Sequence, residues 1–168
     1  MRKDNPSKRS RPQTSADHEL AEAIMSIHRA RVVPLFVRVY RASPAALAKR
    51  AERGISRELL TRLAVLLNLP AGTVGHWLGI RDHRDALRLD RDDSDRVLAL
   101  ASLIGRVQSL VVESGNPANF DAVRWTAGFL TNPHPALGSR RPFECMGTTQ
   151  GRAMVSQLIE QQQSGAYA

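Results

Sequence analysis

Few residues in this chain combine a reactive side chain with a spacing that suits catalysis or metal binding. The single cysteine, Cys145, has apolar neighbours, which favour a buried thiol over a nucleophile. The five histidines, at positions 18, 28, 76, 83 and 134, have neither the i, i+4 spacing nor the carboxylate partners of a metal site. We therefore predict no catalytic residue, no metal and no cofactor. A small enzyme that uses Cys145 or His134 is the weaker alternative.

Two further clusters could hold an ion, but their spacing favours structural roles. The glycines at 72, 75 and 79 do not follow a predicted strand, which argues against a phosphate-binding loop. The aspartates at 90, 92, 93 and 95 lack the pattern of a calcium loop and suit the amino end of the helix that follows them. Neither cluster indicates an enzyme.

Positive charge is unevenly divided along the chain. Residues 1–93 hold 18 Lys and Arg against 11 Asp and Glu, whereas residues 94–168 hold 6 against 5. Within residues 29–62, nine basic side chains are opposed only by Glu52 and Glu58. A field of this kind attracts polyanions such as nucleic acids, although a solvated helix face is the simpler interpretation.

Composition narrows the class of protein. The 168 residues include 42% hydrophobic and 5% aromatic side chains, enough for one or two small cores. No apolar run approaches the roughly 18 residues that cross a bilayer, and the basic amino terminus has no apolar signal segment. A single cysteine excludes an internal disulfide and suits a reducing compartment. We expect a cytoplasmic protein without membrane contact.

Apolar periodicity and helix-capping signals predict an all-α fold for the elements that position these residues. Pro34 should interrupt a first helix or start the next, and Ser43 and Ser56 suit the caps of two more. Leucines at 59, 60, 63, 66 and 67 give the second capped helix a wide apolar stripe. The first half should therefore contain a disordered basic tail over 1–15 and helices at about 16–30, 44–53 and 57–67.

The longest periodic run extends from Ser94 to Glu113. Its apolar side chains recur at alternating spacings of three and four residues and form a stripe wider than one neighbour can cover. We therefore predict that the chain forms a homodimer. Beyond this run the pattern predicts helices at about 119–131 and 149–163, with a loop over 132–139 and a short helical turn at 142–147 between them.

Residues 63–78 have the spacing of a helix-turn-helix, in which two helices cross steeply at a tight corner. Asn68 occupies the turn position that needs a left-handed backbone, and Pro70 suits the first turn of the second helix. This pattern predicts a helix-turn-helix domain over 16–93. The apolar side chains that would fill the corner are Leu63, Leu67, Val74 and Leu78.

The second helix of this corner offers few groups that read bases. Thr73 and His76 could reach base edges, but their neighbours are glycine and alanine. Arg57, Arg62 and Arg81 are better suited to phosphates, so we expect weak and salt-sensitive DNA binding. A degenerate helix-turn-helix retained for packing is the alternative.

The order of short motifs along the chain adds a resemblance to a known family. The corner is followed by Asp92-Asp93-Ser94-Asp95-Arg96-Val97, the loop 132–138, Arg141-Pro142-Phe143-Glu144, Gly151-Arg152 and residues 165–168. This set resembles the Xre/MbcA/ParS antitoxins over about residues 54–168. The resemblance implies a Cro/Xre-like helix-turn-helix domain followed by a small helical toxin-binding domain over 94–168. It also implies that the partner is a RES-domain toxin, which consumes NAD or transfers ADP-ribose.

The resemblance further implies how such a toxin would be neutralised. A pocket that binds NAD needs donors for the pyrophosphate and apolar walls for a ring. The Tyr167 ring and the terminal carboxylate could plug that pocket, while the preceding helix anchors the chain. A frayed tail and a stand-alone helix-turn-helix transcription regulator are the alternatives. The toxin-binding residues expected on this basis are Arg152, Val155, Ile159, Gly165, Ala166, Tyr167 and Ala168.

Overall fold

The computed structural model describes residues 31–80, 86–115 and 119–163. In these ranges the backbone forms helices and turns, and extended pairing is limited to isolated bridges between Ser56 and Arg88 and between His134 and Arg140. The predicted all-α class is confirmed. The tail predicted over 1–15 and the helix predicted over 16–30 lie outside the described residues. No helix in the described ranges is both long and apolar enough to cross a membrane.

The helices follow one another in the predicted order. Residues 31–41 are helical. The α-helices that follow are α2 (Pro44–Glu52), α3 (Arg57–Leu66), α4 (Ala71–Leu78), α5 (Arg91–Glu113), α6 (Ala122–Thr131) and α7 (Thr149–Gln163). Two short 3-10 helices, η1 (Pro135–Leu137) and η2 (Pro142–Cys145), lie between α6 and α7.

Polar side chains determine where several helices begin. The hydroxyl oxygens of Ser43 and Ser56 accept hydrogen bonds from the first turns of α2 and α3, as the sequence predicts. The Asp90 carboxylate accepts a hydrogen bond of 2.8 Å from the backbone N–H of Asp93. The acidic stretch therefore stabilises the start of α5, where the helix dipole favours negative charge.

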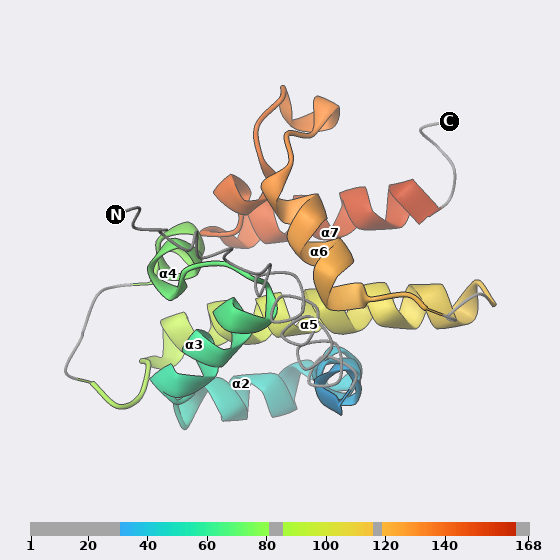
Figure 1. Ribbon diagram of the computed structural model, residues 1–168. Helices are drawn as coiled ribbons and strands as arrows, with labels where there is room; N and C mark the ends of the chain where they lie inside the picture. The colour runs from blue at the N-terminus through green and yellow to red at the C-terminus, as the bar shows by residue number, and fades with distance from the viewer. Residues whose placement is uncertain (1–30, 81–85, 116–118, 164–168) are drawn as a thin grey trace, which may run out of the picture.

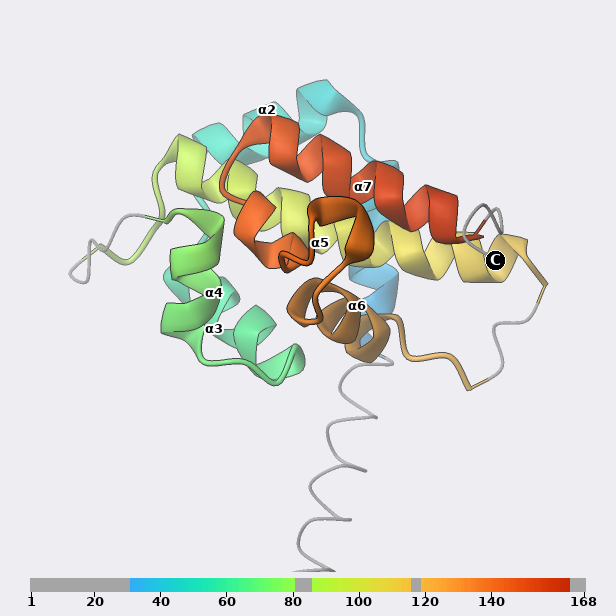
Figure 2. The same ribbon diagram turned by 90° about the horizontal axis from the view of Figure 1, so that it is seen from above.

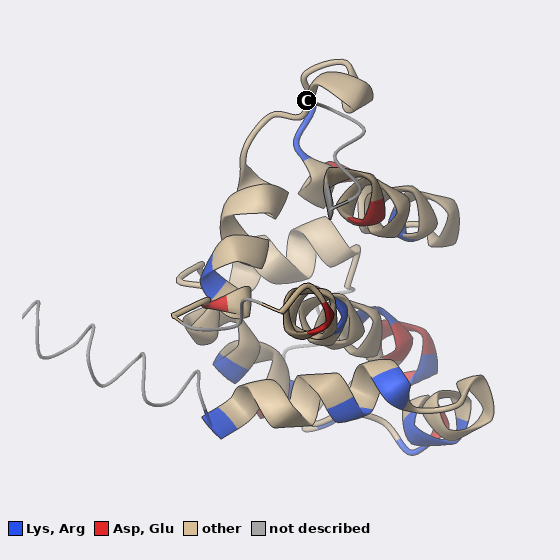
Figure 3. Ribbon diagram, turned by 90° about the vertical axis from the view of Figure 1, so that its right-hand side faces the viewer, with Lys and Arg blue, Asp and Glu red and all other residues tan. Residues whose placement is uncertain are grey.

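Helix α5 runs through the middle of the molecule and organises the other elements (Figure 1). Helix 31–41 and α2 lie on one side of α5, and α6 and α7 lie on the other (Figures 1 and 3). Seen from above, α7 runs alongside α5 (Figure 2). Helix 31–41 crosses α5 so closely that a Cβ atom added at Gly105 would overlap the carbonyl oxygen of Phe36. Only glycine fits at this crossing.

The apolar stripe of α5 is covered from several sides within the chain. Val97, Leu100 and Ile104 are fully buried, and α2, α6 and α7 all pack against α5. The prediction that more than one surface covers the stripe is confirmed. Because the cover comes from the same chain, the stripe gives no separate reason for a second copy, and the homodimer stays a prediction. The domain boundary predicted at 93–94 falls in the first turn of α5, which contacts elements on both sides of it.

Three details of the predicted elements need correction. Pro34 lies within helical backbone that continues from residue 31 to 41, because its fixed φ is compatible with a helix. Leu59 is 38% exposed, so the buried stripe of α3 is narrower than predicted. The loop predicted over 132–139 contains η1, whose start is capped by the His134 ring.

Candidate functional site

The predicted corner forms where α3 meets α4. Asn68 has a φ of 57° in the turn, so it adopts the left-handed conformation that the sequence predicts. Leu63, Val74 and Leu78 are at most 1% exposed and fill the space between the two helices. Pro70 differs slightly from expectation, since it lies at the N-cap of α4 and not inside its first turn.

The exposed side of α4 carries few groups that can contact DNA. His76 is exposed and Thr73 is half-buried, so both predicted base contacts are accessible. Their neighbours Gly72 and Gly75 add no side chain. Arg81, predicted as a phosphate contact, lies outside the described residues.

The two predicted phosphate contacts on α3 already have partners within the chain. Arg57 donates from Nε to the carbonyl oxygen of Ala86 at 3.2 Å, which holds the segment before α5 against α3. Arg62 forms an ion pair of 2.6 Å with Glu58, and both side chains are more than two-thirds exposed. An exposed pair of this kind contributes only about 0–1 kcal/mol, so Arg62 can exchange Glu58 for a phosphate at little cost.

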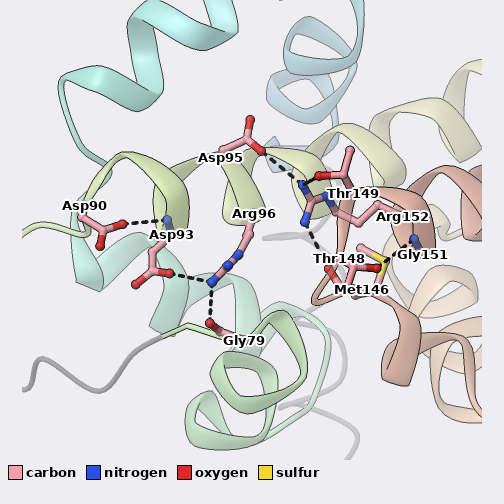
Figure 4. Close-up of polar contacts among 10 residues, drawn as sticks. All are labelled: Gly79, Asp90, Asp93, Asp95, Arg96, Met146, Thr148, Thr149, Gly151 and Arg152. Carbon is pink, nitrogen blue, oxygen red and sulfur yellow. Dashed lines mark hydrogen bonds and ion pairs between the residues drawn. The ribbon is translucent and has the colours of Figure 1, made fainter.

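The Asp-Ser-Asp-Arg motif joins the start of α5 to the corner (Figure 4). The Arg96 guanidinium donates to the carbonyl oxygen of Gly79 at the end of α4 and forms an ion pair of 3.0 Å with Asp93. The Asp93 side chain is 2% exposed, so water screens this pair weakly. The Ser94 hydroxyl accepts a hydrogen bond of 2.9 Å from the backbone N–H of Ile55, just before α3. These contacts give the motif a structural role.

A second junction ties α7 to the same end of α5 (Figure 4). The Arg152 guanidinium lies 3.3 Å from the Asp95 carboxylate and donates to the Met146 carbonyl oxygen at 3.4 Å. A Cβ atom added at Gly151 would overlap the carbonyl oxygen of Cys145, so η2 and α7 approach too closely for any side chain there. With its side chain only 15% exposed, Arg152 acts as a tether within the chain.

The predicted anchor residues on α7 need a correction. Val155 and Ile159 were expected to pack on a toxin, but they are 0% and 3% exposed and belong to the hydrophobic core. The apolar face of α7 is used against α5 and η2, so these side chains hold α7 in place and offer no surface to a partner. The other expected toxin contacts, Gly165, Ala166, Tyr167 and Ala168, lie outside the described residues.

A groove that the sequence did not predict lies between α6, η1 and the end of α7. The rings of Trp125 and Phe129 stack in it, with centroids 5.4 Å apart and planes 5° from parallel. Both side chains are half-buried, so part of each ring faces the groove. The groove has a volume of about 440 Å³, and the residues that line it are Trp125, Phe129, Asn132, Pro133, His134, Pro135 and Gln162.

His134 connects the three elements of this groove. Its Nδ1 accepts a hydrogen bond of 3.2 Å from the backbone N–H of Ala136 in η1. The centroids of the His134 and Phe129 rings lie 5.7 Å apart, with the ring planes at 66°. The Nε2 atom of His134 lies 3.4 Å from the Gln162 side-chain nitrogen on α7. The sequence signal for this site was two aromatic residues one helical turn apart, followed by Pro-His-Pro.

The groove is suited to binding. Its aromatic faces can cover an apolar or planar group, while the exposed side-chain amides of Asn132 and Gln162 can form hydrogen bonds. Cys145 is buried, as predicted, and lies in η2 outside the groove. Across the described ranges, no three His, Cys, Asp or Glu side chains gather into a metal site.

Comparison with known proteins identifies the part of the chain that contains this groove. Residues 118–165 match the family described as the antitoxin Xre/MbcA/ParS C-terminal toxin-binding domain, and this range includes every groove-lining residue. Over 136 residues the chain is 35% identical to the Prs ADP-ribosylating antitoxin of Sphingobium sp. (strain YBL2). That alignment covers 77% of this chain and 86% of the relative. The chain therefore belongs to the Xre/MbcA/ParS family of antitoxins.

Proposed function

We propose that this antitoxin neutralises a RES-domain toxin, of the NAD-consuming or ADP-ribosylating kind, by binding it directly and covering its active site. One observation carries the proposal: the groove with the stacked rings of Trp125 and Phe129 lies inside the matched toxin-binding domain. The name of the Sphingobium relative links that protein to ADP-ribosylation, which supports this chemistry for the partner toxin.

In this proposal the groove takes the anchoring role that Val155 and Ile159 cannot fill. An apolar or aromatic side chain of the toxin would lie against Trp125 and Phe129, which offer a large contact area at a low cost in side-chain entropy. The half-buried position of both rings suits an interface anchor, because such residues are already partly ordered before binding. Groups at the rim would then orient the toxin by hydrogen bonds.

The carboxy-terminal segment completes the proposed mechanism. Gln162 lines the groove near the end of α7, and residues 164–168 follow directly in the chain. Tyr167 supplies an aromatic ring, which complements a pocket built for the rings of NAD. We infer that the groove holds the toxin while segment 165–168 enters its active site.

The corner of α3 and α4 supports a second proposed activity, DNA binding at the promoter of the antitoxin itself. The left-handed turn at Asn68 and the small core beneath it are features of a helix-turn-helix. Thr73 and His76 are the proposed base contacts, and their small number implies weak sequence preference.

Co-expression with a RES-domain toxin tests the proposal. The antitoxin should restore growth, co-purify with the toxin and abolish its NAD consumption. A stand-alone transcription regulator, the alternative function, would bind its promoter without rescuing growth or retaining the toxin. The proposal fails if the purified proteins do not associate, or if the associated toxin keeps its full rate.

A further inference from the structure

A second surface, on the far side of α5 from the groove, carries concentrated positive charge. Helix 31–41, α2 and the residue after it contain six basic side chains and one acidic side chain, Glu52. Lys and Arg recur along this layer of two helices (Figure 3). All six basic side chains are exposed, and together they are called the basic face: Arg31, Arg38, Arg41, Lys49, Arg50 and Arg53.

The packing of the two helices directs this charge outward. Phe36 on helix 31–41 and Ala51 on α2 are buried in the core, so each helix turns its apolar side toward the rest of the molecule. Arg31 and Arg38 are separated by two helical turns and therefore project from the same side of their helix. The basic face is the outer surface of this layer.

Ion pairs among the described residues do not neutralise this charge. In the described ranges, the ion pairs involve Arg62, Arg96, Arg106 and Arg152, none of which belongs to the basic face. Arg50 donates to the carbonyl oxygen of Gly54 at 2.9 Å, which orients its guanidinium but leaves the positive charge uncompensated. The basic face therefore presents its positive charge to solvent.

Helix α4 cannot supply a comparable attraction for a polyanion. It contains no Lys or Arg, and Arg57 on α3 is bonded to Ala86, so Arg62 is the one cation of α3 that can exchange its partner for a phosphate. The affinity of proteins for DNA comes largely from neutralised phosphates and released counterions. Among the described residues, the larger set of cations that could add to the attraction lies on helix 31–41 and α2.

We propose that the basic face binds the phosphate backbone of double-stranded DNA without reading its sequence. Five of its six cations are arginines, whose guanidinium groups form paired hydrogen bonds with phosphate. Arg31 and Arg41 are separated by a helix rise of about 15 Å, over which one DNA strand presents about four phosphates. This inference rests on the proposed DNA binding and assigns most of its affinity to helix 31–41 and α2.

Three variants of the full-length antitoxin separate the basic face from the corner. The combined Arg38→Gln, Arg41→Gln and Lys49→Gln variant removes three charges from the basic face. A control with Arg124→Gln, Arg140→Gln and Arg141→Gln removes three exposed charges near α6 and η2. A Thr73→Ala and His76→Ala variant alters α4. Fluorescence anisotropy would measure binding to a promoter duplex and a scrambled duplex at about 50 to 200 mM salt, and circular dichroism would check folding.

The basic-face variant is expected to lose at least tenfold in affinity for both duplexes. The logarithm of its association constant should also fall less steeply with the logarithm of the salt concentration. The magnitude of this slope should drop by about 2 to 3, because each lost phosphate contact lowers it by roughly 0.9. The control variant should bind like the wild type. An equal loss of affinity in the control variant would overturn the proposal, because the net charge of the protein, and not the basic face, would then explain the binding.

Two other outcomes distinguish this inference from the proposed DNA binding. If the basic-face variant binds like the wild type and the α4 variant does not, the basic face is excluded while the DNA-binding function stands. If the wild type binds neither duplex, both fail. The proposal is also overturned if the basic-face variant keeps its affinity for DNA but no longer binds vesicles containing phosphatidylserine, because the surface is then a membrane contact.

Discussion

The guanidinium of Arg152 on α7 lies 3.3 Å from the carboxylate of Asp95 on α5, 57 residues earlier in the chain. The same guanidinium donates to the Thr149 hydroxyl and the Met146 carbonyl oxygen. The next residue of α5, Arg96, donates a hydrogen bond to the carbonyl oxygen of Gly79 at the end of α4. The start of α5 therefore fixes α4 and α7 at once, which gives the short polar motifs at these positions a structural role.

Arg152→Ala should destabilise the protein by about 1–2 kcal/mol, because it removes a partly buried ion pair and two hydrogen bonds. Chemical denaturation followed by circular dichroism measures this loss. Arg124→Ala, which removes an exposed arginine from α6, is the matched control and should change the free energy of unfolding by less than about 0.5 kcal/mol. A double-mutant cycle with Asp95→Ala should give a coupling of about 0.5–1 kcal/mol. A coupling energy of zero would mean that the Arg152–Asp95 ion pair does not contribute to the free energy of unfolding.

Gly151→Ala and Gly128→Ala should have opposite effects although both add one methyl group. The new Cβ atom at 151 would overlap the Cys145 carbonyl oxygen, and neither backbone can move away without separating η2 from α7. We expect a loss of about 3 kcal/mol or more. At Gly128 in α6 nothing lies within 4 Å, so alanine should stabilise by roughly 0.5–1 kcal/mol. Equal thermal midpoints for the two variants would contradict the close approach of η2 and α7.

The contrast between local and long-range contacts explains how much of this structure could be predicted. Ser43 and Ser56 cap their helices through neighbouring residues, so a short stretch of sequence is enough to locate both starts. The periodicity of α7 shows that Val155 is buried, but not that its neighbours belong to the same chain. The groove depends on the meeting of His134 and Gln162, 28 residues apart, which no local pattern encodes.

Thr126→Val should stabilise the protein by about 1 kcal/mol. Thr126 on α6 is 0% exposed, and its hydroxyl has no hydrogen-bond partner among the residues that the structure describes. Valine has nearly the same shape and removes a buried polar group that otherwise loses its contact with water. Urea denaturation gives the free energy of unfolding. Thr131→Val is the control, because the Thr131 hydroxyl donates to the Ala127 carbonyl oxygen at 2.8 Å and its removal should not stabilise.

Replacing residues that line the groove should weaken binding of the toxin while the fold is preserved. Trp125→Ala removes the larger ring of the stacked pair, and we expect the dissociation constant to rise about 30- to 100-fold. Gln162→Ala changes only an exposed side chain at the rim of the groove and should raise the dissociation constant about 3- to 10-fold. Leu87→Ala truncates an apolar side chain that is 88% exposed outside the groove and should leave affinity unchanged. Wild-type affinity in both groove variants, measured by calorimetry, would exclude the groove as the anchor.

Deletion of residues 165–168 should separate binding from inhibition. If the groove anchors the toxin and the tail only fills the active site, the shortened antitoxin will still co-purify with the toxin, with affinity reduced less than tenfold, but NAD consumption and growth arrest will return. Tyr167→Ala should reproduce most of this effect, whereas Tyr167→Phe keeps the ring and should still inhibit. Full neutralisation by the shortened chain would refute the plug. Loss of association together with inhibition would instead make the tail part of the anchor, because a segment that only occupies the active site contributes little to the remaining interface.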